Sequence, residues 1–193
     1  MFERNDDVLY ICYDNEAYMN TGVQRSSATP PAARTATTPA MGPHPGHEFG
    51  RGKNVPLIAM AHHIPYVATA SVANLRDLED KVTRAINLRG ARYVHIHVPC
   101  PLGWGSAPAD TIKVARAAVE SGLFPLFEAE YGEVTGRTPI RRRLPVDDYL
   151  KLQKRFAHLF SPKRDDARLA QIQAMADRNI VSYGLLDEEG ARG

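Results

Sequence analysis

Short apolar segments alternate with longer amphipathic segments along much of this sequence. Residues 8–13, 66–70 and 93–98 are mostly apolar, rich in β-branched and aromatic side chains, and too short for typical helices. Residues 75–88 and 110–121 carry apolar side chains three and four positions apart, and a glycine lies just beyond each segment. This alternation predicts an α/β fold built on a parallel sheet, in which ligands bind at the carboxyl ends of the strands.

Other segments complete the predicted sheet and its helices. Residues 8–13 show no polar alternation, which predicts a strand buried on both faces. Residues 15–19 are expected to form one helical turn, and residues 55–63 a helix. Residues 123–130 are expected to form the last strand, near an edge of the sheet, because Pro125 cannot donate a ladder hydrogen bond.

The chain changes character near residue 136, which predicts two parts. Residues 1–135 are expected to form a partial α/β domain, and residues 136–193 a helical C-terminal extension. Within the extension, residues 141–164 hold eight Lys or Arg against two Asp. Residues 146–160 and 166–180 have the pattern of helices.

A long loop at residues 21–54 is rich in proline, glycine, serine and threonine and keeps no apolar period. A loop of this length is either a disordered linker or an ordered functional segment. Its glycines match neither the Walker A pattern nor the GxGxxG pattern, which excludes the common phosphate-binding loops. His44 and His47, within residues 42–51, are interpreted as exposed loop residues.

Composition and charge narrow the possible partners. The 193 residues carry a formal net charge of +2, which is too small to indicate a nucleic acid partner. No apolar run approaches the roughly 20 residues needed to cross a bilayer, and the charged start is unlike a secretory signal. Without such a run, we expect no membrane span. Two cysteines cannot form a disulfide framework, so we expect a cytoplasmic protein.

Oxygen-bearing side chains follow the predicted strand at residues 8–13. Asp14 and Asn15 lie where a parallel sheet presents its ligands. An Asn amide oxygen and a backbone carbonyl two residues further on would suit Mg²⁺. Asp and Asn are also common turn formers at strand ends. Because this spacing is not a specific motif, the residues alone favour the turn-former interpretation.

Cys100 follows the predicted strand at residues 93–98, and several interpretations compete for it. It is a buried structural thiol, a nucleophile with His95 or His97 as its base, or an iron–sulfur ligand that needs partner cysteines. His95 and His97 share one face of the strand and weakly suggest zinc, but no fourth ligand is evident. Cys12 lies within a strand and is expected in the core.

A longer stretch is far more specific than these short patterns. Residues 11–30, which read ICYDNEAYMNTGVQRSSATP, resemble nearly throughout the β subunit of 2-oxoacid:ferredoxin oxidoreductases, of the pyruvate:ferredoxin oxidoreductase (pyruvate synthase) kind. The resemblance covers roughly residues 8–160. It continues through Thr37–Ala40, Ile64–Ser71, His97–Gly105, Ala117–Phe127 and Leu144–Gln153.

The resemblance implies a fold, cofactors and site residues. It implies the C-terminal part of a thiamine-diphosphate-binding α/β fold, in which Mg²⁺ holds the cofactor's diphosphate. The side chain of Asn15 and the backbone carbonyl of Ala17 match metal ligands. Asn20 and Thr21 match residues that line the thiazolium and substrate site, and Asn20 is the candidate catalytic residue. Cys100 matches the last cysteine ligand of the [4Fe–4S] cluster nearest the thiamine.

The resemblance also implies a reaction and partners. The family oxidatively decarboxylates a 2-oxoacid to acyl-CoA and CO₂, and [4Fe–4S] clusters pass the electrons to ferredoxin or a similar acceptor. Pyruvate is the default substrate, and phenylglyoxylate, 2-oxoisovalerate, 2-oxoglutarate or oxalate are the alternatives. The implied partners are α and γ subunits and a δ-type ferredoxin subunit.

The sequence departs from the family at several ligands. The Gly-Asp-Gly motif that supplies another Mg²⁺ ligand is absent, as are the N-terminal Cys-x-x-Cys and the third cluster cysteine. We therefore expect the C-terminal portion of a β subunit, inactive as this chain alone and completed by a missing N-terminal half. The alternative is a truncated, non-catalytic assembly subunit that docks through the basic residues 141–164.

Overall fold

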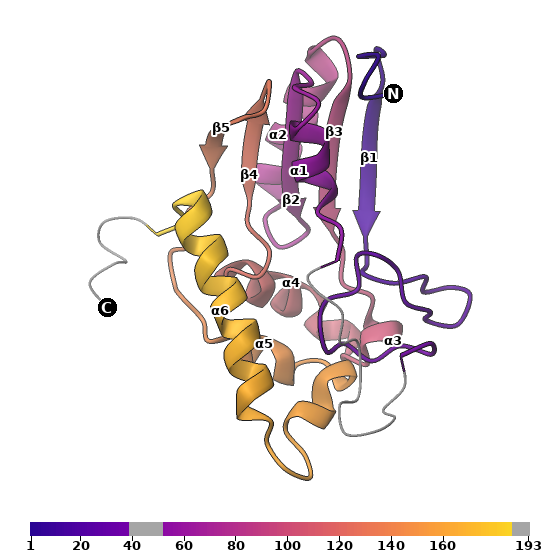
Figure 1. The fold of residues 1–193 in the computed structure, drawn as a ribbon, viewed down its shortest axis with the longest axis vertical. Helices are drawn as coiled ribbons and strands as arrows, with labels where there is room; N and C mark the ends of the chain where they lie inside the picture. Colours follow the sequence, from indigo (N-terminus) through magenta and orange to yellow (C-terminus); the bar gives the residue numbers. More distant parts are fainter. Residues whose placement is uncertain (39–51, 187–193) are drawn as a thin grey trace.

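The strands of this protein form one mixed sheet. The computed structural model describes residues 1–38 and 52–186, so His44 and His47 lie outside the described residues. The described part holds a five-stranded sheet with the order β1-β3-β2-β4-β5 (Figure 1). The first three strands are parallel and the last two antiparallel: β1 Leu9–Asp14, β2 Tyr66–Ser71, β3 Arg92–His97, β4 Phe127–Glu130 and β5 Glu133–Arg137.

Six α-helices and two short 3-10 helices pack around this sheet in the described part. The α-helices are α1 Val55–Met60, α2 Leu75–Asn87, α3 Pro101–Trp104, α4 Thr111–Glu120, α5 Val146–Lys151 and α6 Asp166–Tyr183. The 3-10 helices are η1 Pro108–Asp110 and η2 Lys154–Leu159. Asn54 and Asn74 start α1 and α2 by accepting hydrogen bonds from backbone N–H groups three residues on, which satisfies donors that a helix start leaves open.

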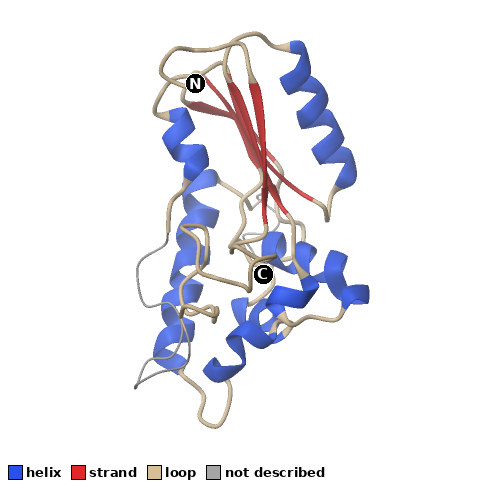
Figure 2. Cartoon of the chain, turned by 90° about the vertical axis from the view of Figure 1, so that its right-hand side faces the viewer, coloured by secondary structure: helices blue, strands red, loops and turns tan. Residues whose placement is uncertain are grey.

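The sheet is covered on both faces and at one end. The side chains of α2 pack on one face over Ala68, Val94 and Ile96, and α1 packs on the opposite face over Val67 and Tyr93. Figure 2 shows the sheet between helices on its two sides. The remaining helices form a layer at the carboxyl ends of the parallel strands (Figure 1).

The layer at the carboxyl ends has its own apolar core. This core surrounds the fully buried Trp104, which ends α3, and includes Ala118 of α4, Leu150 of α5 and Ile172 of α6. Residues before and after position 136 thus share one core, while the boundary between parts 1–135 and 136–193 stays a prediction. Through this sharing, the C-terminal helices are held against the ends of the strands.

Two predictions about burial are wrong. The strand at residues 8–13 was expected to be buried on both faces, but β1 is an edge strand of the described sheet and its Tyr13 is 73% exposed. The apolar spacing of residues 75–88 predicts that Leu75 and Ile86 belong to a buried stripe, but in α2 they are 67% and 61% exposed. The composition of a strand does not show whether it lies at the edge of its sheet. Apolar spacing alone does not determine which face of a helix packs on the sheet.

Several local predictions also differ from the structure. Residues 15–19 form no helical turn, because Tyr18 pairs instead with Gln24 in an antiparallel bridge. The sheet is mixed rather than parallel, since β4 runs antiparallel to β2. The sequence pattern did not predict β5, because its charged and exposed residues show no apolar alternation. The predicted helix at 146–160 is divided into α5 and η2.

Two isoleucines provide a test of this burial pattern. Ile96 is 3% exposed in β3, whereas Ile86 is 61% exposed in α2. We expect Ile96→Ala to lower the free energy of unfolding by about 2–5 kcal/mol, because it leaves a cavity in a packed core. Ile86→Ala is the matched control and should change it by less than about 0.5 kcal/mol. Urea unfolding of the two variants checks this, and equal losses would contradict the observed face of α2.

Candidate functional site

Titratable side chains gather where β1 and β3 end. The parallel register pairs Cys12 with His95 and Asp14 with His97, so these side chains project from one face of the sheet. Thr69 of β2 is the partner of His95 on the other side. In the sequence, His95 and His97 were candidates for a base beside Cys100 or for a weak zinc site, and the resemblance gave them no role. The pairing of separate strands makes them part of a site, and their position on one strand face was the only signal in the sequence.

Asp14 is the first polar group of this site, and it is held on both sides. Its Oδ1 accepts a hydrogen bond from the backbone N–H of Glu16 at 2.7 Å, and its Oδ2 lies 2.8 Å from Nε2 of His95. Nδ1 of His95 lies 2.6 Å from the hydroxyl of Tyr93. Burial is the main reason that the pKa of Tyr93 is raised, so its hydroxyl stays protonated beside His95. This chain of contacts fixes the direction of the turn after β1.

Glu16 is the second acid of the turn, and it forms a buried ion pair. Its carboxylate binds Nη2 of Arg155 and lies 3.5 Å from Nε2 of His97. Burial opposes ionisation of this carboxyl, but Arg155 and His97 outweigh it and lower the pKa of Glu16 to about 2. Glu16 is therefore ionised at neutral pH, even though its side chain is only 13% exposed.

Arg155 joins three separate segments of the chain. Its guanidinium lies 3.7 Å from the centre of the Trp104 ring, and its Nε donates to Oε1 of Gln153 at 2.8 Å. The indole N–H of Trp104 in turn donates to the backbone carbonyl of Asn15 at 2.9 Å. We call Glu16, Trp104 and Arg155 the Arg155 clamp, because together they hold the turn after β1 against α3 and η2.

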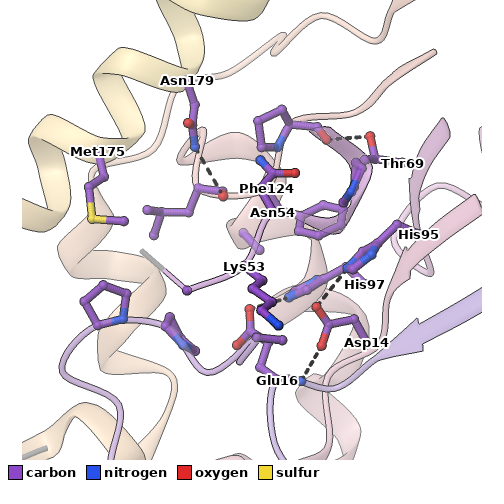
Figure 3. A pocket seen from close by; sticks show the side chains of 18 of the residues that line it. Asp14, Glu16, Lys53, Asn54, Thr69, His95, His97, Phe124, Met175 and Asn179 are labelled. Atoms are coloured by element: carbon purple, nitrogen blue, oxygen red, sulfur yellow. Dashed lines mark hydrogen bonds and ion pairs between the residues drawn. The ribbon is translucent and has the colours of Figure 1, made fainter. Parts of the chain in front are cut away.

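A cavity of about 330 Å³ lies beside these acids, between the sheet and α6 (Figure 3). Asp14, Glu16, His95 and His97 form its polar end, while Met175 belongs to the apolar lining. Within the described ranges, Nδ1 of the 99% buried His97 has no hydrogen-bond partner. A polar cavity of this size can hold ordered water, which would satisfy that nitrogen.

The five site residues predicted from the resemblance lie outside this cavity. Asn15 and Ala17 follow β1 directly, and Asn20 and Thr21 are exposed at the tip of a turn. This turn is closed by the N–H of Tyr18, which donates to the carbonyl of Gln24 at 2.9 Å. Figure 3 shows that the Asp14 and Glu16 side chains project into the cavity. The predicted residues therefore form a second region that borders the first.

Cys100 is brought close to this turn by helix α3. Cys100 precedes α3 and is half-buried, and both Cys100 and Met19 pack on the core around Trp104. A Cβ placed on Gly103 would lie 2.2 Å from Sδ of Met19, so α3 and the turn approach each other closely. The structure therefore places the predicted cluster ligand and the predicted cofactor residues on adjoining segments.

The residues present suit a magnesium ion in part. Among the hydrogen bonds between described residues, none occupies the side-chain oxygen of Asn15 or the carbonyl of Ala17. The neighbouring acids Asp14 and Glu16 are already bound to His95 and Arg155. No group of three or more His, Cys, Asp or Glu in the described part could hold a metal ion. Mg²⁺ would therefore take neutral oxygens here and complete its shell with phosphate, water or further residues.

An iron–sulfur cluster needs more cysteines than this sequence contains. The sequence has two cysteines, and Cys12 lies in β1, where burial raises the pKa of its thiol. Cys100 can therefore serve as one ligand, and a four-iron cluster would need cysteines from outside this sequence.

An α/β domain with a polar turn at the end of a parallel strand is the architecture of a cofactor-binding domain. Residues 1–97 match the family model described as thiamine pyrophosphate enzyme, C-terminal TPP binding domain, and the chain belongs to this family. The predicted α/β fold of this class is thereby confirmed. In the described part, no helix is long and apolar enough to cross a membrane.

Two relatives are similar to this chain over most of its length. Pyruvate synthase subunit PorB of Methanosarcina barkeri is 47% identical over 184 residues, which cover 95% of this chain and 62% of that protein. Ketoisovalerate oxidoreductase subunit VorB of Pyrococcus abyssi is 45% identical over 159 residues, or 81% of this chain and 51% of that protein. The resemblance to this kind of subunit is confirmed, and the chain spans about 62% and 51% of the lengths of these relatives.

Among solved structures, the 2-oxoglutarate:ferredoxin oxidoreductase from Magnetococcus marinus, with 2-oxoglutarate, coenzyme A and succinyl-CoA bound, aligns at 25% identity with a TM-score of 0.45. That alignment covers 52% of this chain and 33% of the other.

The buried ion pair predicts a strong effect of Glu16→Gln. We expect the free energy of unfolding to fall by about 3–5 kcal/mol at neutral pH, because Arg155 would stay buried without its counter-ion. Since the pKa of Glu16 falls from 4.5 to about 2 on folding, the wild type keeps this contribution above about pH 4.5 and loses it toward pH 2. Urea unfolding from neutral to acidic pH measures both effects. A Glu16→Gln variant as stable as the wild type at neutral pH would contradict the ion pair.

Proposed function

We propose that this chain is the thiamine-diphosphate-binding part of a 2-oxoacid:ferredoxin oxidoreductase β subunit of the pyruvate synthase type. It would take part in oxidative decarboxylation of a 2-oxoacid to acyl-CoA and CO₂, with electrons passed to ferredoxin or a similar acceptor. The observation that carries the proposal is the 47% identity to a pyruvate synthase subunit over 95% of this chain. The turn between β1 and Gln24 supports it, because it presents unoccupied oxygens at a strand end.

In this proposal, Asn15 and Ala17 hold the metal ion of the cofactor. The amide oxygen of Asn15 and the carbonyl of Ala17 would bind Mg²⁺, whose remaining positions take the diphosphate of the cofactor. Both residues follow β1, where the carboxyl end of a parallel strand presents ligands. The neighbouring acids are engaged by His95 and Arg155, so they would not compete for the ion.

Asn20 and Thr21 would act on the substrate. Thiamine diphosphate, when bound, supplies the electron sink that allows CO₂ to leave a 2-oxoacid. Asn20 would donate a side-chain hydrogen bond to the substrate-derived oxygen and stabilise the charge that develops there. Thr21 would line the same site. Their exposure at the tip of the turn leaves both side chains accessible to a substrate.

The names of the relatives support candidate substrates, and the resemblance implies the partners. Pyruvate is the first candidate, and 2-oxoisovalerate is the second, because one relative is named a ketoisovalerate oxidoreductase subunit. Phenylglyoxylate, 2-oxoglutarate and oxalate belong to the same chemical class. The proposed partners are the α, γ and δ-type ferredoxin subunits, together with β-subunit residues that this sequence does not contain.

The alternative of a non-catalytic assembly subunit has weaker support. It relied on free basic side chains within residues 141–164. Four of these are paired inside this chain: Arg143 with Asp177, Lys151 with Asp147, Arg155 with Glu16, and Arg164 with Asp147 and Asp166. Much of the positive charge is therefore neutralised before any partner arrives.

An assay of the assembled enzyme tests the proposed function. We expect the complex isolated through a tag on this chain to reduce ferredoxin or a viologen dye when given pyruvate and coenzyme A. Asn20→Ala should lower kcat by about 10²–10³, the usual effect of losing one donor to a developing charge. Asn87→Ala, at an exposed position in α2, is the control and should keep full activity. A stably assembled complex that turns over no 2-oxoacid would refute the proposal.

A cysteine exchange tests the cluster ligand. In the same complex, Cys100→Ser should abolish the EPR signal of the cluster nearest the thiamine, because a serine replaces one of its thiolate ligands. Thiamine diphosphate binding should persist. Cys12→Ser is the matched control, since Cys12 lies within β1, and it should keep the signal. An unchanged signal in Cys100→Ser would exclude Cys100 as a ligand.

A further inference from the structure

We propose that Arg155 is a positioning residue that holds the metal-binding turn and the start of α3 in one arrangement. This inference rests on the proposed function, because it assigns Arg155 a role toward the Mg²⁺ and cluster ligands named there. Arg155 itself touches neither Asn20 nor Cys100 in any contact of the described residues. It acts through Glu16 on one side and through Trp104 on the other.

The first step is the geometry of the turn. The carbonyl of Asn15 accepts from the indole of Trp104 at 2.9 Å, and the carbonyl of Glu16 accepts from Oγ1 of Thr29 at 2.6 Å. The next carbonyl along the chain, that of Ala17, has no hydrogen-bond partner among the described residues. The backbone of the turn is thus tied at two points, and the oxygen proposed for Mg²⁺ is left available.

The second step is the strained residue between these points. Glu16 has a positive φ of 65°, which non-glycine residues rarely adopt because the side chain crowds the backbone. Its carboxylate is held by Arg155 and His97, so side-chain contacts stabilise this backbone conformation. Loss of Arg155 would free the side chain of Glu16 and let the turn relax. The direction of the Ala17 carbonyl depends on that turn.

The third step links the clamp to Cys100. Helix α3 has four residues, and the N–H of Trp104 donates to the carbonyl of Cys100 at 2.9 Å. Trp104 is fully buried with Arg155 over its ring, so one guanidinium fixes the end of the helix that follows Cys100. The same side chain therefore positions a proposed cluster ligand and two proposed metal ligands.

Arginine suits this role for a geometric reason. Its planar group stacks on Trp104 with its face while its edge donates to Glu16 and to Gln153. A lysine ammonium supplies the charge and hydrogen-bond donors, but it has no planar group that can lie on Trp104 while its edge donates to Glu16 and Gln153. Because Arg155 belongs to η2, the part after residue 136 contributes directly to the geometry of the turn after β1.

A measurement of Mg²⁺ and thiamine diphosphate binding to the assembled complex distinguishes a positioning role of Arg155 from a role in stability alone. Arg155→Met should weaken Mg²⁺-dependent thiamine diphosphate binding about 10–100-fold in calorimetric titration, as expected when a ligand loses its supporting contact. The double variant Glu16→Gln with Arg155→Met leaves no unpaired buried charge, so thermal stability should recover. Binding should stay weak, because the clamp is still absent.

Two further variants complete this test. Arg155→Lys keeps a positive charge beside Glu16 but has no planar group to lie on Trp104, so the complex should assemble and bind more weakly. This variant tests the positioning role of Arg155 if Arg155→Met fails to assemble. Lys154→Met changes the exposed neighbour and should bind as the wild type does.

The outcomes distinguish the inference from the proposed function. A wild-type complex that binds no thiamine diphosphate would refute the proposed function. If the wild type binds and the double variant recovers both stability and affinity, Arg155 has only a structural role and the inference is overturned. Wild-type affinity in Arg155→Lys would overturn it as well.

Discussion

The buried ion pair between Glu16 and Arg155 is the interaction on which the arrangement of the site depends. It joins the turn after the first strand to a segment 139 residues further along the chain. A charge buried alone would be costly, so each partner requires the other in place. Trp104 extends the pair by stacking on Arg155 and by binding the backbone of Asn15. The turn, α3 and the C-terminal helices therefore adopt one mutual arrangement.

The parallel strands set where this interaction can form. Parallel pairing of β1 and β3 places Asp14, His95 and His97 at one end of the sheet, and helices α4 to α6 close that end. Two regions result. One is a polar cavity whose acids are already paired. The other is a turn in which the amide oxygen of Asn15 and the carbonyl of Ala17 accept no hydrogen bond from the described residues. The charged groups lie in the first region, and the magnesium ion that we propose for the second would bring the anionic diphosphate as a ligand.

Much of the fold could be predicted from local patterns. Strands β2 and β3 and helices α1, α2 and α4 lie close to their predicted positions, because each has a clear apolar period or a flanking breaker. The predictions failed where the neighbours of an element decide its structure. The exposure of β1 depends on which strand lies beside it, and β5 has no apolar pattern of its own because it is exposed at the far edge.

The sequence by itself determined the α/β class and the family, because a long specific stretch such as residues 11–30 can be recognised without any tertiary contact. The residues that it assigns to the chemistry stay a prediction. Only the tertiary structure decided which acids are paired. Nothing in the spacing of Glu16 and Arg155 indicates their contact, since separation along a chain does not predict proximity in space. The ionised state of Glu16 and the clamp around Trp104 follow from that contact alone.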